Sequence, residues 1–544
     1  MNVKDVIEVE IGSSGMDGEG VARVDGKVVF IPYTLEGERV RAVVKTVKKN
    51  FCTAQAIKIL QASRHRVEPS CPHYYKCGGC DTMHFSAEYR KNMLVDDLRN
   101  NLKKIADLSA DDIPFVECER PTRNKTAMPF GLRGGKVVLG MYSKNTHDIV
   151  PVECSAAGGL ARNIGKIVCD LANEKKLSVY DGASGRGLLR HLVVRVIGER
   201  AQAVLVVNCA RFADESVLKA LCARIPHGVD FFICFNTAKN NVIMSDRITK
   251  IKGDDRLEVN VMGVVAELSP LSFFQVNDEI RDKLYERAIG HVLSENLIDL
   301  YSGIGITSNL AAKKCKRVTA VECVPQAVRD ADRTAELNGN SHKILNLCGD
   351  VEDVIDGLDG GDCDVLIDPP RKGCGVAVMA AVAKKAPNRI IYISCNHATM
   401  CRDIKPLTDT GKYKVVDCAV FDMFCNTHHT ETLVVLSKKI PDSHINIDVE
   451  FGESEGQFSL KKIKERAEER KPKEKVTYKM IQDYIEKTYG FKVHTAYIAK
   501  VKRDLGLPMC DTPNAVEELK RPRAHPTPKM VEAIKETLKY FEII

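Results

Sequence analysis

The stretch R-I-I-Y-I-S-C-N, residues 389–396, reads as a short buried β-strand that ends abruptly in a cysteine. Residues 390–393 are strand formers in a run of strand length, and small or polar residues follow from Ser394. Cys395 is therefore expected at the carboxyl end of a strand, where ligands and reacting groups lie in open α/β sheets. A cysteine that merely packs in the core would be the commoner explanation for an isolated strand, but other strands surround this one in the sequence.

Strand and helix patterns alternate on both sides of this stretch. N-L-I-D-L-Y-S-G-I-G-I-T-S (296–308) predicts a strand, a glycine turn and the start of a helix. V-T-A-V-E ends a second strand at Glu322, C-D-V-L-I-D-P-P-R-K-G carries a third into Asp368, and T-L-V-V-L-S-K-K (432–439) is the last. This alternation indicates a parallel sheet with helices between its strands, an α/β fold of the Rossmann-like kind.

The first two of these strands carry the features of an adenosyl site. Gly303 and Gly305 follow the first strand, and Glu322 closes the second, where a carboxylate can take the hydroxyl groups of a ribose. A third phosphate-cradling glycine is missing, since Ile306 and Thr307 open the helix. A ligand without a pyrophosphate, such as S-adenosylmethionine, therefore fits better than a dinucleotide.

Three reactive groups are expected at or just beyond the same sheet edge: Asp368, Cys395 and Glu431. A thiolate beside a methyl donor and a base suits methylation of uracil at carbon 5. That carbon is a poor nucleophile until a thiolate adds to carbon 6, and a base must later remove its proton. We expect Cys395 to be the nucleophile, Asp368 to hold the base or the donor, and Glu431 to take the proton.

A cysteine cluster lies much earlier, in C-P-H-Y-Y-K-C-G-G-C. Cys71, Cys77 and Cys80 stand at intervals of six and three, and two glycines allow the backbone to bend around a metal. Cys154 is a candidate for the fourth ligand. Four thiolates suit an iron–sulfur cluster or a tetrahedral zinc ion, and the spacing does not decide between them.

The remaining patterns divide the chain. The first residues alternate with period two and contain a strong turn pair at Asp25-Gly26, which predicts a small barrel of the oligonucleotide-binding kind. Two helical segments near the C-terminus suggest a winged-helix-like unit that binds nucleic acid or docks on a protein. We expect a β-barrel (1–60), a mixed α+β domain with the cysteine cluster and an RNA-binding surface (61–290), a methyltransferase domain (291–440), a charged linker (441–475) and a helical appendage (476–544).

Composition limits the compartment and the partners. The 544 residues include 80 Lys and Arg against 73 Asp and Glu, so nucleic-acid binding must depend on local basic patches. The charged N-terminus lacks the apolar core of a signal peptide, and no apolar run approaches the roughly 18 residues of a membrane helix. Twenty scattered cysteines in such a chain predict a reducing cytoplasm and no membrane association.

These motifs together resemble the RNA 5-methyluridine (uracil-C5) methyltransferase family, especially its 23S ribosomal RNA branch. The resemblance covers residues 1 to about 440, and the N-terminal barrel is similar to the TRAM domain of that branch. The motifs that carry it are F-F-Q-V-N, D-L-Y-S-G-I-G, V-E, D-P-P-R-K-G, Y-I-S-C-N and D-M-F with T-x-H-x-E-T.

The resemblance implies a role for each matching residue. Cys395 would be the nucleophile and Glu431 the proton acceptor. The residues implied to hold S-adenosylmethionine are Gln275, Tyr301, Glu322 and Asp368, with Asp350 as a further candidate. Those implied to bind a 4Fe–4S cluster, with zinc as the alternative, are Cys71, Cys77, Cys80 and Cys154. The chain departs from the family pattern at Ile306, where some members have a polar residue, and at Cys425-Asn426, where many have Pro-His in the loop before Glu431.

The expected substrate is 23S ribosomal RNA, with transfer RNA as the alternative, and the expected state is a monomer. The target uridine would have to be flipped into the pocket. A radical methylthiotransferase is disfavoured because its cysteines need intervals of four and three. An amino-group methyltransferase would not use Cys395, and a non-catalytic RNA-binding protein would not retain donor residues, thiol and base together.

Overall fold

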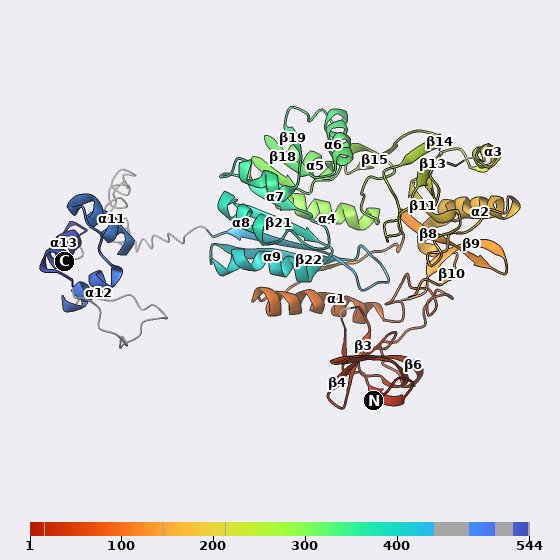
Figure 1. Cartoon of the computed structure of the whole chain (residues 1–544), viewed down its shortest axis with the longest axis horizontal. Helices are drawn as coiled ribbons and strands as arrows, with labels where there is room; N and C mark the ends of the chain where they lie inside the picture. Colours follow the sequence, from red (N-terminus) through yellow and green to blue (C-terminus); the bar gives the residue numbers. More distant parts are fainter. Residues whose placement is uncertain (16, 145, 213, 440–477, 506–525, 542–544) are drawn as a thin grey trace, which may run out of the picture. The chain divides into compact units, whose positions relative to one another are not determined.

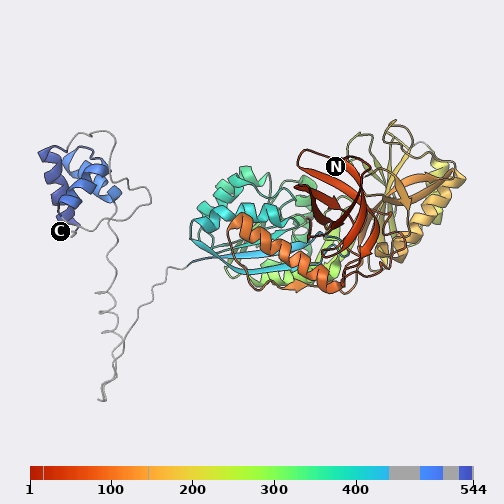
Figure 2. The ribbon, with the colours of Figure 1, turned by 90° about the horizontal axis from the view of Figure 1, so that it is seen from below.

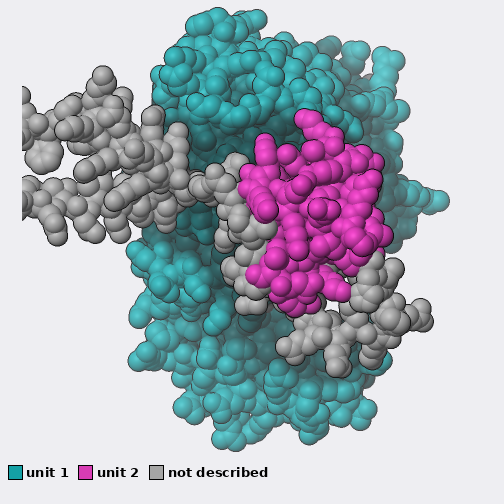
Figure 3. All heavy atoms as spheres, turned by 90° about the vertical axis from the view of Figure 1, so that its left-hand side faces the viewer, with its two compact units in different colours: residues 1–442 teal, residues 443–544 magenta. Residues whose placement is uncertain are grey.

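The computed structural model describes all residues except 16, 145, 213, 440–477, 506–525 and 542–544 (Figure 1). The chain forms two compact units, residues 1–442 and residues 443–544 (Figure 3). The predicted charged linker (441–475) lies wholly outside the described residues. The finer division predicted within the first unit stays a prediction. No helix among the described residues is long and apolar enough to span a membrane.

The N-terminal β-domain is a six-stranded sheet in the order β1-β5-β6-β4-β3-β2. The predicted hairpin is confirmed at Asp25 and Gly26, where both φ angles are positive (49° and 77°). Alternate residues of the strands point into a small apolar core, because strand side chains alternate between faces. The strands are β1 (Val6–Glu10), β2 (Ser13–Ser14), β3 (Gly20–Val24), β4 (Lys27–Ile31), β5 (Arg39–Val47) and β6 (Phe51–Gln61).

A seven-stranded sheet, β10-β9-β8-β11-β12-β13-β14, forms the middle of the first unit. Helices α2 (Gly158–Glu174) and α3 (Glu215–Arg224) pack on it around a shared apolar core. The strands are β8 (Lys125–Arg133), β9 (Lys136–Tyr142), β10 (Ile149–Pro151), β11 (Leu189–Ile197), β12 (Arg200–Val207), β13 (Val229–Phe235) and β14 (Ile248–Lys252). A separate hairpin, β15 (Leu257–Val261) and β16 (Val264–Leu268), follows.

The third sheet has eight strands in the order β19-β18-β17-β20-β21-β23-β22-β7. The first five are parallel, whereas β23 runs antiparallel to β21. All five strands expected from the sequence are present; β19, β22 and the two-residue β7 were not expected. Their bounds are β7 (Phe115–Val116), β17 (Asn296–Leu300), β18 (Arg317–Glu322), β19 (Ile344–Cys348), β20 (Asp364–Ile367), β21 (Arg389–Ser394), β22 (Tyr413–Phe421) and β23 (Glu431–Lys438).

Helices cover both faces of this sheet (Figure 1). In β21, Ile390 and Tyr392 join one apolar core while Ile391 and Ile393 join the other, so the quoted stretch is buried on both sides. One face carries α1 (Ala87–Asn101) with its π-helical extension (Leu102–Ala106), α7 (Val351–Val354), a 3₁₀ turn (Ile355–Gly357), α8 (Val376–Lys385) and α9 (His397–Asp409). The other carries α4 (Asp278–Gly290), α5 (Ile306–Ala312) and α6 (Pro325–Leu337).

The second unit contains three described helices around a core of its own: α11 (Tyr478–Tyr489), α12 (Thr495–Asp504) and α13 (Pro528–Tyr540). Ile481, Ile485, Ile498 and Ile534 are buried in this core. The two predicted helical segments correspond to α11 and α12, and α13 packs against both. In the first unit, α1 lies along the large sheet and beside the N-terminal β-domain (Figure 2).

Candidate active site

The topology of the large sheet collects the predicted reactive residues on one edge. Strands β17 to β21 are parallel, so their carboxyl ends meet there, and the antiparallel β23 begins there. The strand order places six predicted residues in a row along this edge: Asp350, Glu322, Tyr301, Asp368, Cys395 and Glu431. Gln275 comes from a loop before α4 instead.

Cys395 and Glu431 stand at the same level of two neighbouring strands. Ser394 pairs with Thr432 in the β21–β23 ladder, and the Thr432 hydroxyl donates to the Ser394 carbonyl at 2.9 Å. The next residue of β21 and the preceding residue of β23 are therefore brought side by side. Burial and the nearby Glu431 carboxylate raise the pKa of the Cys395 thiol, Arg371 lowers it, and the net pKa is about 11.

Glu431 is a buried carboxyl group without a local partner. Its residue is 4% exposed, and its Oε2 has no hydrogen-bond partner in the described structure. Burial and the negative charge of Asp368 raise the pKa of Glu431 well above its usual value, while Arg371 lowers it. A raised pKa makes the Glu431 carboxylate a stronger proton acceptor than an exposed one, which suits a general base.

Asp299, a residue that the sequence did not single out, adds a third carboxyl group. It lies fully buried in β17, where its Oδ2 accepts from the hydroxyls of Thr307 at 2.8 Å and Ser308 at 2.6 Å. Burial raises the pKa of Asp299 to about 6 and that of Asp368 to about 7, with Asp299 contributing to the second shift. Because charges this close repel, these carboxyl groups hold protons more tightly than isolated ones.

Arg371, in the D-P-P-R motif, places a positive charge at this site, and the sequence pattern assigned it no role. Its positive charge lowers the pKa of the Cys395 thiol. The first turn of α9 fixes its backbone, because Asn396 Nδ2 and Thr399 Oγ1 each donate to the Arg371 carbonyl at 3.3 Å. The Asn396 side chain also caps α9.

The turn after β17 forms the part of the site where the methyl donor is predicted to bind. Glu322 Oε2 accepts from the Gly303 N–H at 3.1 Å, and its Oε1 accepts from the Val324 N–H at 2.8 Å. Gly303 has φ +56° and open space where a Cβ would be, whereas a Cβ on Gly305 would press on Ala331 at 3.1 Å. Glycine is therefore needed at 305 for helix packing, and the space beside Gly303 and Glu322 suits an adenosyl group.

Three further residues were predicted to hold S-adenosylmethionine, and fewer contacts define their positions. Tyr301 has φ +63°. Its pKa is raised mainly by burial, and the nearby Cys374 and Asp350 raise it further. Asp350 itself is exposed at the start of α7. Gln275 is 3% exposed, but no hydrogen bond found in the described residues joins its side chain to the edge. Ile306 packs in the apolar core at 5% exposure, which explains an apolar residue there.

The loop 422–430, which leads into Glu431, is fastened to the segment that follows the cysteine cluster. Arg90 makes two hydrogen bonds of 2.7 Å to the Asp422 carboxylate. The Asn426 carbonyl accepts from the backbone N–H groups of Asp81 and Thr82 at 3.0 and 3.1 Å. His428 Nδ1 pairs with Asp81 at 2.7 Å. The loop position is therefore set by residues more than 300 positions away.

The other unusual residues of this loop have structural partners. Asn426 adopts a left-handed conformation with φ +64°, which asparagine tolerates better than most residues. Cys425 lies beside Cys118, and Asn277 Nδ2 donates to both sulfurs, at 3.8 and 3.1 Å. His429 has its pKa lowered to about 4 by burial and the neighbouring cations, so it is neutral near pH 7.

The four predicted cluster cysteines are neighbours. Each of Cys71, Cys77 and Cys154 affects the pKa of another cysteine in the set, and Cys77 and Cys154 both raise that of Cys80. The Gly79 N–H donates to Cys77 Sγ at 3.3 Å. Even so, no group of three or more His, Cys, Asp or Glu side chains among the described residues has the arrangement of a metal site. Four cysteine thiols are chemically suited to bind an iron–sulfur cluster or a zinc ion. In this structure, their side chains are not arranged as metal ligands.

Comparisons with known proteins agree with this architecture. The TRAM domain family matches residues 2–57, and the family described as tRNA (uracil-5-)-methyltransferase matches residues 355–439, which include Asp368, Cys395 and Glu431. An RNA methyltransferase of Caldanaerobacter subterraneus is 36% identical over 443 residues, covering 79% of this chain and 98% of its own length. This chain belongs to the TRAM-containing RNA (uracil-5-)-methyltransferase family.

Two other proteins align with a similar share of this chain. An RNA methyltransferase of Halalkalibacterium halodurans is 35% identical and covers 81% of this chain and 98% of its own length. The crystal structure of Pyrococcus abyssi tRNA (uracil-54, C5)-methyltransferase with S-adenosyl-L-homocysteine covers 79% of this chain and 99% of its own, at 22% identity and a TM-score of 0.64. The predicted fold class, an α/β methyltransferase domain with an N-terminal TRAM β-domain, is confirmed.

Proposed function

We propose that this enzyme methylates carbon 5 of uridine in RNA through a covalent adduct between Cys395 and carbon 6 of the base. The observation that carries the proposal is the pairing of a thiol with a buried, unpartnered carboxylate oxygen on Glu431 at the same level of two strands. Neither group has an evident structural task. Together they supply the nucleophile and the base that this reaction requires.

The steps follow from the positions of the side chains. The Cys395 thiolate, stabilised by Arg371, forms a bond to carbon 6, and the electrons of the double bond pass into an enolate. S-adenosylmethionine, when bound, supplies the electrophilic methyl group that carbon 5 attacks. Glu431 then removes the proton from carbon 5, the double bond reforms and the thiolate is expelled. Asp368, with its own raised pKa, holds the donor or the proton acceptor in place.

The donor would be held at the glycine turn. Glu322, beside the open space at Gly303, would take the ribose hydroxyls. Tyr301 and Asp350 would flank the adenosyl group, and Gln275 would reach it from its loop. The Pyrococcus abyssi enzyme, whose crystal structure contains S-adenosyl-L-homocysteine, supports a donor of this class.

We propose 23S ribosomal RNA as the substrate, on the strength of the TRAM domain together with the four neighbouring cysteines. Transfer RNA is the second candidate, because the structural neighbour is named a tRNA methyltransferase. Cys71, Cys77, Cys80 and Cys154 would hold a 4Fe–4S cluster, or zinc, that orders the RNA-binding region. We further propose that the protein acts in the cytoplasm, which agrees with the free thiols of the described cysteines, and that it acts as a monomer.

The test is a trapping experiment with RNA that contains 5-fluorouridine. Fluorine at carbon 5 cannot be removed as a proton, so an enzyme of this type stays attached to the RNA. Transcripts of 23S ribosomal RNA and of transfer RNA are offered in parallel with S-adenosylmethionine. A stable adduct on the ribosomal transcript supports the proposal, and one on the transfer RNA alone selects the second substrate. Adduct formation by Cys395→Ala, or N-methylated nucleosides as products, would contradict it.

A further inference from the structure

Two cysteines outside the proposed mechanism are brought together at the edge of the large sheet. β7 and β22 run parallel, with Val116 opposite Phe421, and the Asp422 N–H donates to the Val116 carbonyl at 3.0 Å. The chain therefore leaves the two strands side by side and in the same direction. Cys118 follows two residues after β7, and Cys425 follows four residues after β22. The strand pairing thus makes neighbours of two residues that are far apart in the sequence.

One side chain contacts both sulfurs. Asn277 caps α4, and its side-chain oxygen accepts from a backbone N–H of the first turn, which leaves the Nδ2 group facing the cysteines. Nδ2 donates to Cys118 Sγ at 3.1 Å and to Cys425 Sγ at 3.8 Å. Each thiol in turn donates to a backbone carbonyl, Cys118 to Arg120 at 2.9 Å and Cys425 to Asp422 at 3.4 Å. The two thiols therefore surround a single amide group.

The charges around the two thiols differ. Burial raises the pKa of Cys425, and Asp422 and Cys118 raise it further. The effect of Cys118 is a repulsion between two negative sulfurs, so it disappears once Cys118 is oxidised. The pKa of Lys283 is raised mainly by its hydrogen bond to Glu279 and, to a smaller extent, by Cys118. A cation therefore lies near the Cys118 sulfur, where it favours the thiolate.

We propose that Cys118 and Cys425 are a redox modification site, which a peroxide converts into a disulfide. Both residues are half-buried, and Cys118 lies between the exposed Glu117 and Glu119, where a small oxidant can reach it. The Cys118 thiolate attacks one peroxide oxygen, the O–O bond breaks, and a sulfenic acid and a hydroxide ion form. The Cys425 sulfur then attacks the sulfenic sulfur and expels a second hydroxide.

The balance of this reaction is complete with the peroxide as the oxidant. The protons of the two thiols convert the two hydroxide ions to water, so two thiols and one hydrogen peroxide give one disulfide and two water molecules. A dithiol reductant reverses the change by thiol–disulfide exchange. The site is therefore reversible in a compartment that keeps thiols reduced.

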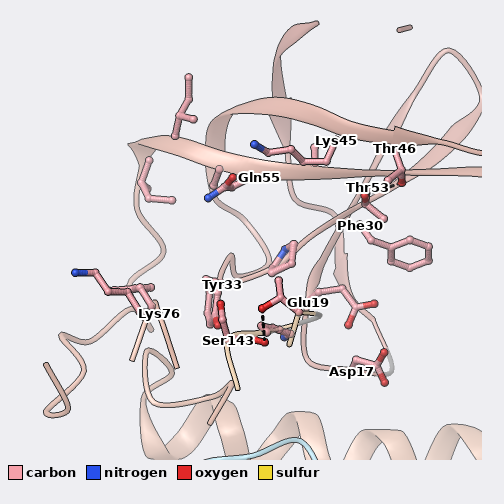
Figure 4. A pocket seen from close by; sticks show the side chains of 18 of the residues that line it. Asp17, Glu19, Phe30, Tyr33, Lys45, Thr46, Thr53, Gln55, Lys76 and Ser143 are labelled. Carbon is pink, nitrogen blue, oxygen red and sulfur yellow. Dashed lines mark hydrogen bonds between the residues drawn. The ribbon is translucent and has the colours of Figure 1, made fainter. Parts of the chain in front are cut away.

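The loop that contains Cys425 is fastened on both sides of that residue. Its first residue pairs with Arg90. Further along, His428 lies between two carboxylates, with Asp81 at 2.7 Å from Nδ1 and Asp17 at 3.7 Å from Nε2. Asp17 belongs to the N-terminal β-domain and lines the hollow shown in Figure 4. Formation of a bond at Cys425 therefore strains this loop, because neither end can move freely.

The disulfide should slow turnover, a consequence that rests on the proposed function. The two sulfurs of a disulfide are about 2 Å apart, closer than two thiols that share a hydrogen-bond donor. Oxidation therefore displaces the loop that leads into Glu431, whereas Cys395 follows another strand. A small displacement of a catalytic group can lower the rate roughly 10- to 100-fold. We expect a loss of this size in methylation at saturating RNA, with trapping of 5-fluorouridine RNA on Cys395 retained.

The test treats the full chain with hydrogen peroxide and maps disulfide-linked peptides by mass spectrometry. Methyl incorporation into the transcript that the untreated enzyme methylates is measured before and after addition of dithiothreitol. A peptide pair joining Cys118 to Cys425 should appear as turnover falls, and the dithiol should reverse both changes. Melting temperatures verify that the oxidised protein and each variant are folded.

Serine variants identify the thiols that respond. Cys118→Ser and Cys425→Ser should methylate RNA within about twofold of the parent before oxidation and should resist the reversible loss after it, because neither can form the disulfide. Cys222→Ser serves as the matched control, since it removes another half-buried thiol that donates to a backbone carbonyl. It should lose turnover with peroxide as the parent does.

Three outcomes would overturn the proposal: no linked peptide in the oxidised parent, equal reversible inhibition of Cys118→Ser, or a linked peptide with unchanged turnover. The first two would place the oxidation on other thiols, and the third would show that the bond does not control the loop. Failure of the proposed function is distinguishable. The reduced parent would then form no Cys395 adduct with 5-fluorouridine RNA, although the peptides of Cys118 and Cys425 would still become linked.

Discussion

At the scale of single residues, the proposed chemistry depends on the charged side chains that raise or lower the pKa of the Cys395 thiol. Cys395 is surrounded by Glu431 and Asp368, which disfavour its thiolate, and only Arg371 favours it. The arginine is therefore the group whose removal should alter the reactivity of the sulfur most. Its neighbour Lys372, which is also exposed and is not among the groups that shift the pKa of the thiol, offers a matched control.

The pH dependence of Cys395 alkylation should follow from the pKa of about 11. Only the thiolate reacts with iodoacetamide, so the rate in the free enzyme should rise about tenfold for each pH unit between roughly 7 and 10. Arg371→Ala removes the charge that lowers this pKa and should move the curve to higher pH, whereas Lys372→Ala should not. Peptide mapping of the alkylated protein measures the rate. A plateau below pH 8 in the parent would contradict the expected pKa.

At the scale of elements, the loop 422–430 is held by the pair between Arg90 and Asp422 (12% and 5% side-chain exposure). Arg90→Met leaves the Asp422 carboxylate buried without its cation, which should cost about 3 kcal/mol of unfolding free energy. Since Glu431 follows this loop, turnover should also fall at saturating RNA. Denaturant unfolding and single-turnover methylation measure the two effects. Lys166→Met, which breaks an exposed pair on α2, serves as the control and should change neither.

The cysteine segment is a second element with a separable role. Cys77→Ser should weaken folding or RNA binding while leaving the thiolate chemistry possible, because the proposed methyl transfer uses no group from the cluster. The measurement is 5-fluorouridine trapping at saturating RNA, alongside RNA affinity. Loss of trapping in a folded, RNA-bound variant would instead mean that the segment acts on Glu431 through the Asp81–His428 contact.

These contacts show why the sequence predicted one part of the site and not the rest. Glu322 ends a strand, and Asp368 and Cys395 directly follow two others. The carboxyl edge of a parallel sheet brings such residues together whatever the conformation of the loops. The Arg90–Asp422 pair joins residues 332 positions apart, so no local sequence pattern predicts it. Asp299 lies inside an apolar strand, where its partners are hydroxyls from the next helix. The two-residue β7 is too short to leave a periodic signal.

At the scale of the whole molecule, the first unit contains every residue of the proposed mechanism. Relatives that align over about 80% of this chain are matched over nearly their full length, and residues 1–442 form a compact unit. A protein ending at residue 442 should therefore fold and methylate RNA with a kcat within about twofold of the full chain. Methyl incorporation and a melting curve verify this. A truncated protein that folds but fails to methylate would assign the helical unit a part in catalysis.

The central claim is that Cys395 and Glu431 act on one uracil ring, and Glu431→Gln tests it most directly. With ordinary uridine RNA and S-adenosylmethionine, this variant should stall after methyl transfer, because the carbon 5 proton has no acceptor. A protein–RNA band should then survive denaturing electrophoresis, with the RNA mapped by mass spectrometry to the peptide containing Cys395. The exposed control Glu286→Gln should give no such band. A folded Glu431→Gln enzyme that turns over normally and leaves no adduct would contradict the account.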